Sequence, residues 1–368
     1  MPRMTLPFVL CWALLSTLAA VAMAHVAGAV NPHEKVSGVW LVGAASCIYV
    51  LAYRFYGRWL ARTVVQLDDT RLTPAVRLND GVNFHPTNRV VLFGHHFAAI
   101  AGAGPLLGPV LAAQFGFLPG FLWLVIGAVL AGAVQDFIIL VASMRHNGRS
   151  LPEIAHDELG SITGTATAVA VLFIVVVALA GLGFAVVNAL YHNAWGTFTI
   201  AMTIPIGLLM GFYLQRFRPG AVAEVSAIGL VLLLAAVLFG RVVGQSSYAS
   251  WFEFEKPALV WLLAGYGFIA SVLPGWMLLV PRGYLSTFMK LGVVFLLGLG
   301  VILMAPTIEM PRLTSFANGG GPIIPGTLFP FLFITIACGA VSGFHSLVSS
   351  GTTPKMIEQE SQAVVGYA

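Results

Sequence analysis

Long apolar runs, separated by short polar segments, dominate this chain. Each run approaches or exceeds the roughly 20 residues that a helix needs to cross the hydrocarbon core of a bilayer. The pattern therefore predicts an all-α, polytopic integral membrane protein, a helix bundle in which residues 1–368 form a single membrane domain. About ten transmembrane helices are expected, near residues 6–30, 36–54, 93–114, 118–143, 163–190, 196–214, 222–240, 258–280, 284–305 and 327–349.

Composition supports this fold class. Hydrophobic residues make up 58% and charged residues 9% of the 368 residues, whereas a soluble domain is about one quarter charged. The net charge of +4 does not indicate nucleic acid, because the basic residues lie in short loops between apolar runs. Cys11, Cys47 and Cys338 lie far apart within apolar runs and match no metal or disulfide spacing. We therefore expect the lipid bilayer as a partner, and no cofactor, metal or nucleic acid.

The basic residues predict how the chain is oriented. With the N-terminus in the cytoplasm, thirteen Lys and Arg residues fall on the inner side and four on the outer side, which follows the positive-inside rule. The inner set is Arg3, Arg54, Arg58, Arg62, Arg71, Arg77, Arg89, Arg145, Arg149, Arg216, Arg218, Arg282 and Lys355. The outer set is Lys35, Arg241, Lys256 and Arg312, and Lys290 falls within a span.

The two ends of the sequence have separate features. The first run resembles a secretory signal with Ala22-Met23-Ala24 as its cleavage site, but its extension to Val30 favours a retained helix. Residues 364–368 follow a hydrophilic loop and resemble the first residues of another span. We expect a sequence that is truncated at its C-terminus.

Residues 93–109 combine glycines with Pro105 and Pro109 inside one span. Each proline removes a helix hydrogen bond, so a discontinuous helix is expected, as in the midplane substrate sites of secondary transporters. A helix that restarts at Pro105 would present unpaired N–H groups to a substrate carboxylate. The candidate substrate-binding residues here are Gly102, Gly104, Pro105 and Gly108. Tight packing of helices through Gly104 and Gly108 is the alternative.

A second candidate break lies five spans later, at Gly265, Gly267, Pro274 and Gly275, and Pro274 and Gly275 are further candidate substrate-binding residues. Inverted repeats of five helices place two broken helices at this spacing. The pattern thus predicts a five-plus-five, LeuT-like core with substrate between spans three and eight. No residue-level repeat connects the two segments.

Several side chains are candidates for proton coupling. Asp136 is an isolated carboxyl group within a span, where ionisable residues are costly. Lys290 lies at a comparable depth, so a structural Asp136–Lys290 pair is the alternative. His95 and His96 point about 100° apart on a helix, which excludes joint binding of one metal and leaves proton carriers or satisfied polar residues.

The last span ends in a stretch rich in hydroxyl groups. His345 is a further candidate proton carrier, and Ser346 and Thr352 are candidate substrate ligands that line a cavity. An ordinary helix cap and turn would use the same residue types.

These motifs together resemble the carbon starvation protein A family. The resemblance rests on the segments 78–81, 86–88, 91–105, 135–137, 195–199, 342–347 and 351–355. It implies a multi-pass protein of the bacterial inner membrane that imports pyruvate or small peptides during carbon starvation, coupled to protons or another cation. It also implies a transporter core of the amino acid–polyamine–organocation type, and members that continue well beyond residue 368.

A starvation-induced membrane sensor or interaction protein without transport is the alternative function. An enzyme is not expected, because the sequence holds no phosphate-loop pattern, nucleophile elbow or paired carboxylates on one helix face.

Overall fold

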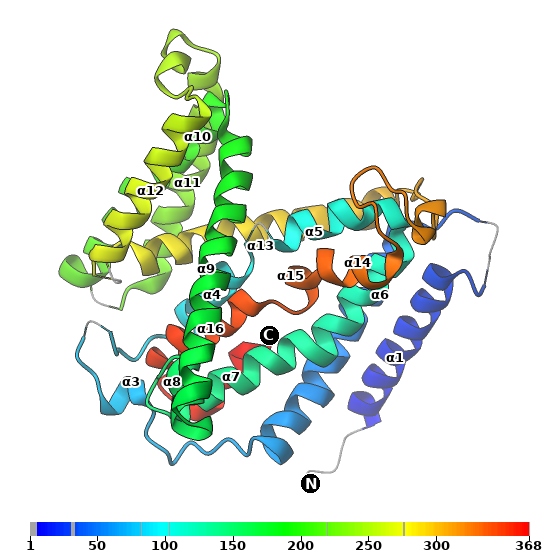
Figure 1. Ribbon diagram of the computed structural model, residues 1–368, viewed down its shortest axis with the longest axis horizontal. Helices are drawn as coiled ribbons and strands as arrows, with labels where there is room; N and C mark the ends of the chain where they lie inside the picture. Colours follow the sequence, from blue (N-terminus) through cyan, green and yellow to red (C-terminus); the bar gives the residue numbers. More distant parts are fainter. Residues whose placement is uncertain are drawn as a thin grey trace.

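The chain folds into helices joined by short connections (Figure 1). The computed structural model describes residues 6–30, 34–81, 83–102, 104–218, 220–274 and 277–367. Within these ranges the one extended pairing is an isolated bridge between Ser37 and Thr307. The predicted all-α class is confirmed.

Seven described helices are long and apolar enough to cross a membrane: Val9–Ala27, Gly38–Val64, Phe117–Arg145, Ser161–Leu190, Ala194–Phe217, Val222–Gly244 and Val280–Met304. Three other predicted spans are shorter or interrupted helices, so the ten runs predicted from hydropathy all contain helix. The multi-pass membrane character is thereby supported by length and composition.

The uninterrupted helices have the following bounds: α1 (Leu6–Ala27), α9 (Ser161–Leu190), α11 (Val222–Gly244), α12 (Lys256–Val272) and α13 (Leu279–Met304). Short π-helical segments extend or join the others: α2 (Gly38–Leu51) with η1 (Ala52–Gly57) and η2 (Leu60–Val64), α6 (Phe117–Gly127) and α7 (Ala133–Arg145) through η4 (Ala128–Gly132), and α10 (Ala194–Phe212) with η5 (Tyr213–Phe217).

The connections contain shorter elements: α3 (Pro74–Arg77), η3 (Ala113–Phe115), α8 (Leu151–Leu159), η6 (Ser247–Trp251), η7 (Ser315–Asn318), η8 (Thr353–Lys355) and η9 (Glu360–Tyr367). The hydropathy pattern does not predict α8, because it is short and polar. A capping box between Ser150 and Glu153 begins this helix and satisfies its first N–H groups. Residues 364–367, predicted as the beginning of a span, belong to η9, which packs on α7.

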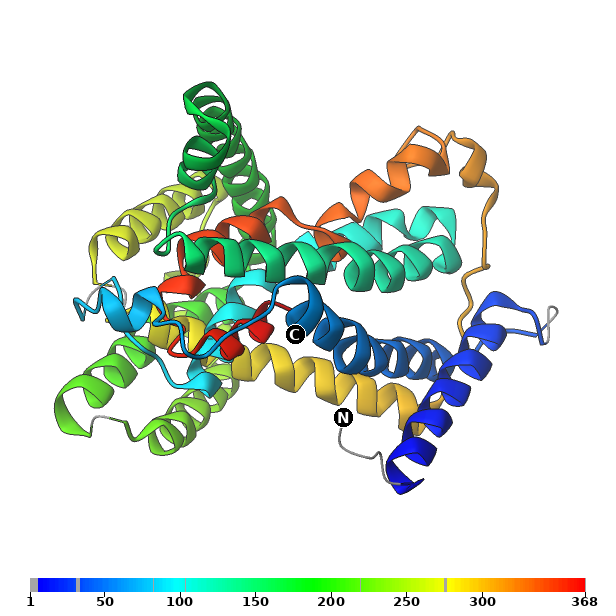
Figure 2. The ribbon, with the colours of Figure 1, turned by 90° about the horizontal axis from the view of Figure 1, so that it is seen from below.

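The helices form two groups. In Figure 1, α9 to α12 rise steeply from α13, which runs across the picture together with α5, α6 and α7. Figure 2 shows α13 (yellow) alongside α2 (blue). Helices α10 and α11 pack on α13 and connect the two groups.

Two of the predicted spans are discontinuous helices in the structure. The third span consists of α4 (Arg89–Ile100) and α5 (Gly104–Ala112), as predicted. The last span consists of α14 (Leu328–Thr335), α15 (Ala337–Ala340) and α16 (Gly343–Gly351). The two spans run antiparallel, because α4 packs on α16 whereas α5 packs on α14 and α15.

The prediction of a broken helix at residues 265–275 is wrong. Gly265 and Gly267 lie within the continuous helix α12, and Pro274 belongs to the connection between α12 and α13. Gly275 lies outside the described residues. A glycine costs a helix only about 1 kcal/mol, which a helix in lipid tolerates. The second broken helix is instead the span at 328–351.

Candidate functional site

A buried carboxyl group and a histidine meet where α4 ends. Asp136, in the first turn of α7, is 4% exposed, and its Oδ2 lies 3.1 Å from Nδ1 of His345 on α16. The Nε2 of His345 lies 3.1 Å from the carbonyl oxygen of Ile100, the last residue of α4. Three helices thus converge on the break in the third span.

The backbone at the break explains why this carbonyl is available. Ala101 has φ −78° and ψ 63°, the geometry of an inverse γ-turn, and the Gly102 N–H donates to Ile100 O at 2.8 Å. The chain therefore leaves the helix at Ile100, and its carbonyl has no partner one turn further along α4. His345 supplies a second donor.

The hydrogen bonds fix the number of protons in this pair. A carbonyl oxygen only accepts, so Nε2 of His345 carries a hydrogen. One further proton must lie between Nδ1 and Asp136 Oδ2: either protonated Asp136 donates to a neutral His345, or ionised Asp136 accepts from an imidazolium. Losing that proton would leave two lone pairs facing each other at 3.1 Å.

Polar groups around the pair hold the second break in place. Gln135 Nε2 donates to the Ser342 carbonyl at 2.8 Å and to Ser346 Oγ at 2.6 Å. The other carboxyl oxygen of Asp136, Oδ1, is buried and has no hydrogen-bond partner. Helix α7 therefore contacts both the bend that precedes α16 and the end of α4.

His95 and His96 are buried and point to different neighbours, as predicted. His96 Nδ1 lies 2.8 Å from Thr353 Oγ1, and its Nε2 has no partner. His95 Nδ1, also without a partner, faces Gly283 on α13, where an added Cβ would lie 3.3 Å from it. Among the described residues, no group of three or more His, Cys, Asp or Glu side chains could hold a metal ion.

The Asp136–Lys290 pair, the alternative derived from sequence, is wrong. Lys290 Nζ donates to the Ala98 carbonyl at 2.6 Å, whereas Asp136 contacts His345. Both interactions therefore involve the C-terminal turn of α4, where a cation or N–H donor is favourable because the helix carbonyls are unpaired.

The predicted substrate residues occupy different environments. An added Cβ at Gly104 would lie 2.5 Å from Cys338 Sγ, and one at Gly108 would lie 2.6 Å from the Thr335 carbonyl oxygen, so both glycines allow close packing. A Cβ at Gly102 would meet nothing within 4 Å.

The remaining candidates divide between the site and other regions. Pro105 lies in the first turn of α5, where its Cα is 3.9 Å from a Cβ added at Gly339. Ser346 bonds Gln135, and Thr352 ends α16 next to Thr353, the partner of His96. Pro274 follows α12 and is not part of this arrangement.

Sequence reasoning missed a cavity of about 480 Å³ between α10, α11, α12 and α13. Arg282 and Lys290 both line it, together with Thr203, Tyr266 and Ser286. Arg282, which the positive-inside count assigned to the inner side, lies in the first turn of the membrane-length helix Val280–Met304. Its position eight residues before Lys290 was the available signal.

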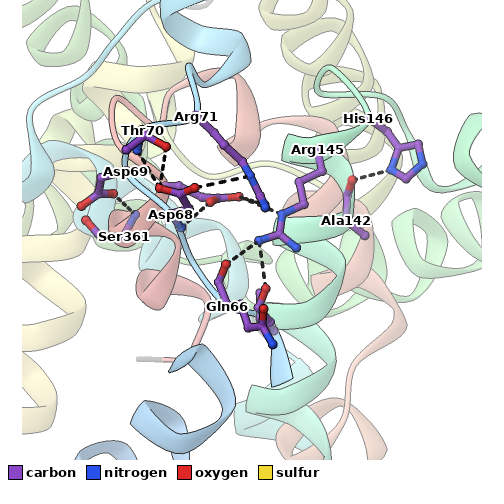
Figure 3. Close-up of polar contacts among 11 residues, drawn as sticks. Gln66, Asp68, Asp69, Thr70, Arg71, Ala142, Arg145, His146 and Ser361 are labelled. Atoms are coloured by element: carbon purple, nitrogen blue, oxygen red, sulfur yellow. Dashed lines mark hydrogen bonds and ion pairs between the residues drawn. The ribbon is translucent and has the colours of Figure 1, made fainter. Parts of the chain in front are cut away.

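A second polar cluster lies at the other end of α7 (Figure 3). Glu360 accepts from Arg145 Nε at 2.8 Å and from the Asp68 backbone N–H at 2.6 Å, and Arg71 Nη1 lies 3.7 Å away. Asp69 Oδ1 accepts from the Ser361 N–H at 2.7 Å. These contacts attach η9 to the loop after η2.

A comparison of the sequence with protein families assigns the chain to a known family. The family model described as Carbon starvation protein CstA matches residues 37–368. The chain belongs to the CstA family. The resemblance inferred from motifs is confirmed, and relatives of this family that the chain matches are named as transporters.

Relatives in the CstA family carry two kinds of name. The chain is 55% identical over 360 residues to "Peptide transporter CstA" of Escherichia coli (strain K12), which covers 97% of this chain and 51% of the relative. It is 51% identical over 360 residues to "Pyruvate/proton symporter BtsT" of the same strain, with 97% and 50% covered. "Peptide transporter CstA" of Mycobacterium tuberculosis (strain ATCC 25618 / H37Rv) is 55% identical over 338 residues, with 91% and 45% covered.

The chain spans about half the length of the curated relatives that it matches. No solved structure matches it.

Proposed function

We propose that this CstA-family chain belongs to a secondary active transporter of the bacterial inner membrane. It imports pyruvate or small peptides, with protons as the coupling ion, in the response to carbon starvation. The names of the relatives support the substrates, since one is a peptide transporter and another a pyruvate/proton symporter. The observation that carries the proton coupling is the Asp136–His345 pair, which needs one proton to remain closed on the end of α4.

The pair offers a direct link between a proton and a conformational change. With its proton, His345 joins α7 and α16 to the break of the third span. Without the proton, repulsion between Asp136 and His345 favours separation of these helices. A transporter needs such an element, whose two arrangements differ in proton affinity.

The proposal retains an inverted-repeat, LeuT-like core in a changed form. The discontinuous span α14–α16 takes the place of the predicted span eight as the antiparallel partner of span three, which consists of α4 and α5. Gly102, Pro105, Ser346 and Thr352 remain proposed substrate contacts at these breaks, and His95 and His96 remain proposed proton carriers. The single membrane domain and the cytoplasmic N-terminus also remain proposals.

The test is proton-driven uptake by the full-length protein in proteoliposomes. Asp136→Asn keeps a donor toward His345 and so mimics the protonated state, but it cannot release a proton. Accumulation of labelled pyruvate or dipeptide under an inward proton gradient should be abolished, while exchange of internal for external substrate should partly persist.

His345→Gln should give the same separation of accumulation from exchange. Asp157→Asn is the matched control, because Asp157 lies in α8 and pairs with Arg149 at the surface. Proton-driven accumulation at the wild-type level in Asp136→Asn would refute the coupling role. A wild-type protein that moves neither pyruvate nor peptides would favour the sensor.

A further inference from the structure

Two cationic side chains, Arg282 and Lys290, line the cavity between the two helix groups. Arg282, Ser286 and Lys290 are spaced four residues apart on α13, so they lie along one stripe of the helix, and all three line the cavity. Thr203 on α10 and Tyr266 on α12 line the facing walls.

Arg282 is held in a defined position. Its Nε donates to Thr203 Oγ1 at 3.1 Å, an Nη donates to the Tyr266 hydroxyl, and the guanidinium carbon lies 4.6 Å from the centre of the Tyr266 ring. A guanidinium fixed in this way retains unused N–H donors in a planar arrangement that matches a carboxylate.

Neither cation has an acidic partner within the described part of the chain. The ion pairs found there do not include Arg282 or Lys290. Lys290 lies well inside a membrane-length helix, where an uncompensated charge is costly and marks a binding site or ion pathway, and Arg282 lies in the first turn of the same helix. The chemistry of the cavity therefore calls for an anion.

The position of Lys290 distinguishes between kinds of anion. It lies eight residues, or about 12 Å along the helix, from Arg282. It reaches the same turn of α4 that His345 contacts, because it donates to the Ala98 carbonyl while His345 bonds Ile100. A small soluble anion can occupy this depth, whereas a lipid phosphate stays near the interface.

We propose that this cavity is the binding site for the carboxylate of a small organic anion, with Arg282 and Lys290 as its cationic ligands and with Thr203 and Ser286 in its polar lining. The inference rests on the proposed function and names the part of the substrate that is recognised, a carboxylate that pyruvate and peptide C-termini share.

The position of the cavity connects binding to transport. A carboxylate that attracts Lys290 weakens its bond to Ala98 O and so alters the helix end on which the Asp136–His345 pair closes. The cavity is lined by residues of α10, α11 and α12 on one side and of α13 on the other, so movement of one helix group against the other would change its size.

Equilibrium binding of labelled pyruvate to the full-length protein tests the site at one fixed pH. In nanodiscs of phosphatidylcholine, Arg282→Gln and Lys290→Gln should each raise the Kd by about tenfold or more, as expected for the loss of a charge-assisted hydrogen bond. Arg282→Lys should retain part of the affinity, and the uncharged amide of pyruvate should not compete.

Two further variants separate binding from folding. Ser286→Leu keeps both cations but fills the space between them, and should also abolish binding. Arg241→Gln, at the far end of α11, is the control and should bind like the wild type. Each variant is compared by size-exclusion profile and by proton-driven uptake.

The outcomes are distinguishable. Wild-type Kd values in Arg282→Gln and Lys290→Gln, in a protein that still takes up pyruvate or dipeptide with protons, would overturn the site and leave the proposed function standing. Failure of the wild type to bind or move any carboxylate would overturn both. Retention of cardiolipin by the wild type but not by Arg282→Gln, without displacement by saturating pyruvate, would assign the cavity to a lipid headgroup instead.

Discussion

Arg145 Nε lies 2.8 Å from Glu360 Oε1, and Glu360 is 1% exposed. This ion pair joins the C-terminal end of α7 to η9, a segment more than 200 residues later in the chain. Because the second carboxyl oxygen accepts from the Asp68 N–H, the same side chain also holds the loop that follows η2. Three distant segments are thus fixed by one buried carboxylate.

Arg145→Gln should destabilise the protein by about 3 kcal/mol, because it leaves Glu360 buried with a weakened partner set. Thermal unfolding of the purified protein measures the loss. The matched control is Arg149→Gln, four residues further along, whose partner Asp157 is more exposed and whose loss should cost less than about 1 kcal/mol. Equal effects of the two substitutions would contradict a structural role for the buried pair.

Gly104→Ala should destabilise the protein by about 1–3 kcal/mol, because its Cβ would lie 2.5 Å from Cys338 Sγ. Adding Cys338→Ala should recover part of this loss, since the sulfur is removed. Gly102→Ala is the control, with nothing within 4 Å of the added methyl group. If Gly102→Ala is the more damaging change in a thermal unfolding assay, the packing explanation fails.

The contacts of His146, in the connection between α7 and α8, predict that the stability of the fold depends on pH. Its Nε2 lies 2.8 Å from Glu158 Oε1 and its Nδ1 lies 2.7 Å from Ala142 O, so both nitrogens face acceptors. These hydrogen bonds, above all the one that His146 donates to Glu158, raise the pKa of His146 above 6.5. A raised pKa stabilises the fold fully below the unfolded-state pKa and loses this contribution as the pH rises through the folded-state value.

The difference in melting temperature between wild type and His146→Gln should therefore decrease from about pH 5.5 to about pH 8.5. This interval is on the order of the pH range in which histidine ordinarily titrates. Glu158→Gln should remove most of this pH dependence. A difference that grows with pH would have the wrong sign for this mechanism.

The orientation can be tested at two exposed positions. Thr70 lies in the Arg-rich loop predicted to be cytoplasmic, and Ser315 lies in the connection predicted to be periplasmic. In a background that carries Cys11→Ala, an impermeant thiol reagent added to intact cells should label Ser315→Cys and spare Thr70→Cys. Labelling of Thr70→Cys from outside would reverse the topology.

Segments that were predicted to lie on the outer side of the membrane contact one another in the structure. The Gly38 N–H donates to Pro306 O at 2.7 Å, and Lys35 forms an ion pair with Glu309. The predicted inner residues Arg71 and Arg145 meet at Glu360. The alternation derived from hydropathy is therefore consistent for these spans.

Hydropathy was sufficient to locate the helices, because a run of apolar residues is the main requirement for crossing lipid. The glycines and prolines of residues 93–109 located the break before Pro105, because a proline removes a hydrogen bond from the helix. The interruption at 335–343 was missed because no proline marks it. That bend depends instead on Gln135, which bonds the Ser342 carbonyl from another helix.

The partners within the site were harder to predict. Asp136 and His345 were both candidates, but they are separated by 209 positions in the chain and no spacing rule relates them. A pair between Lys290 and Asp136 was the alternative derived from the sequence, yet the acceptor of Lys290 within the protein is the backbone oxygen of Ala98. The carbonyl oxygens of Ala98 and Ile100 can accept from side chains because α4 ends at Ile100, so that the N–H groups of a following helical turn do not occupy them.

The steep arrangement of α9 relative to α13 has a consequence for the thickness of the membrane. Helix α9 has 30 residues and is about 45 Å long at 1.5 Å per residue, against a hydrocarbon core of about 30 Å. Helices α9 and α13 cannot both lie along the normal of one flat bilayer. Because α9 is the longer helix, it has the greater apolar length to accommodate by tilting. Thin bilayers would favour a strongly tilted α9 and thick bilayers a more upright one, so the lipid itself would bias the angle between the two helix groups.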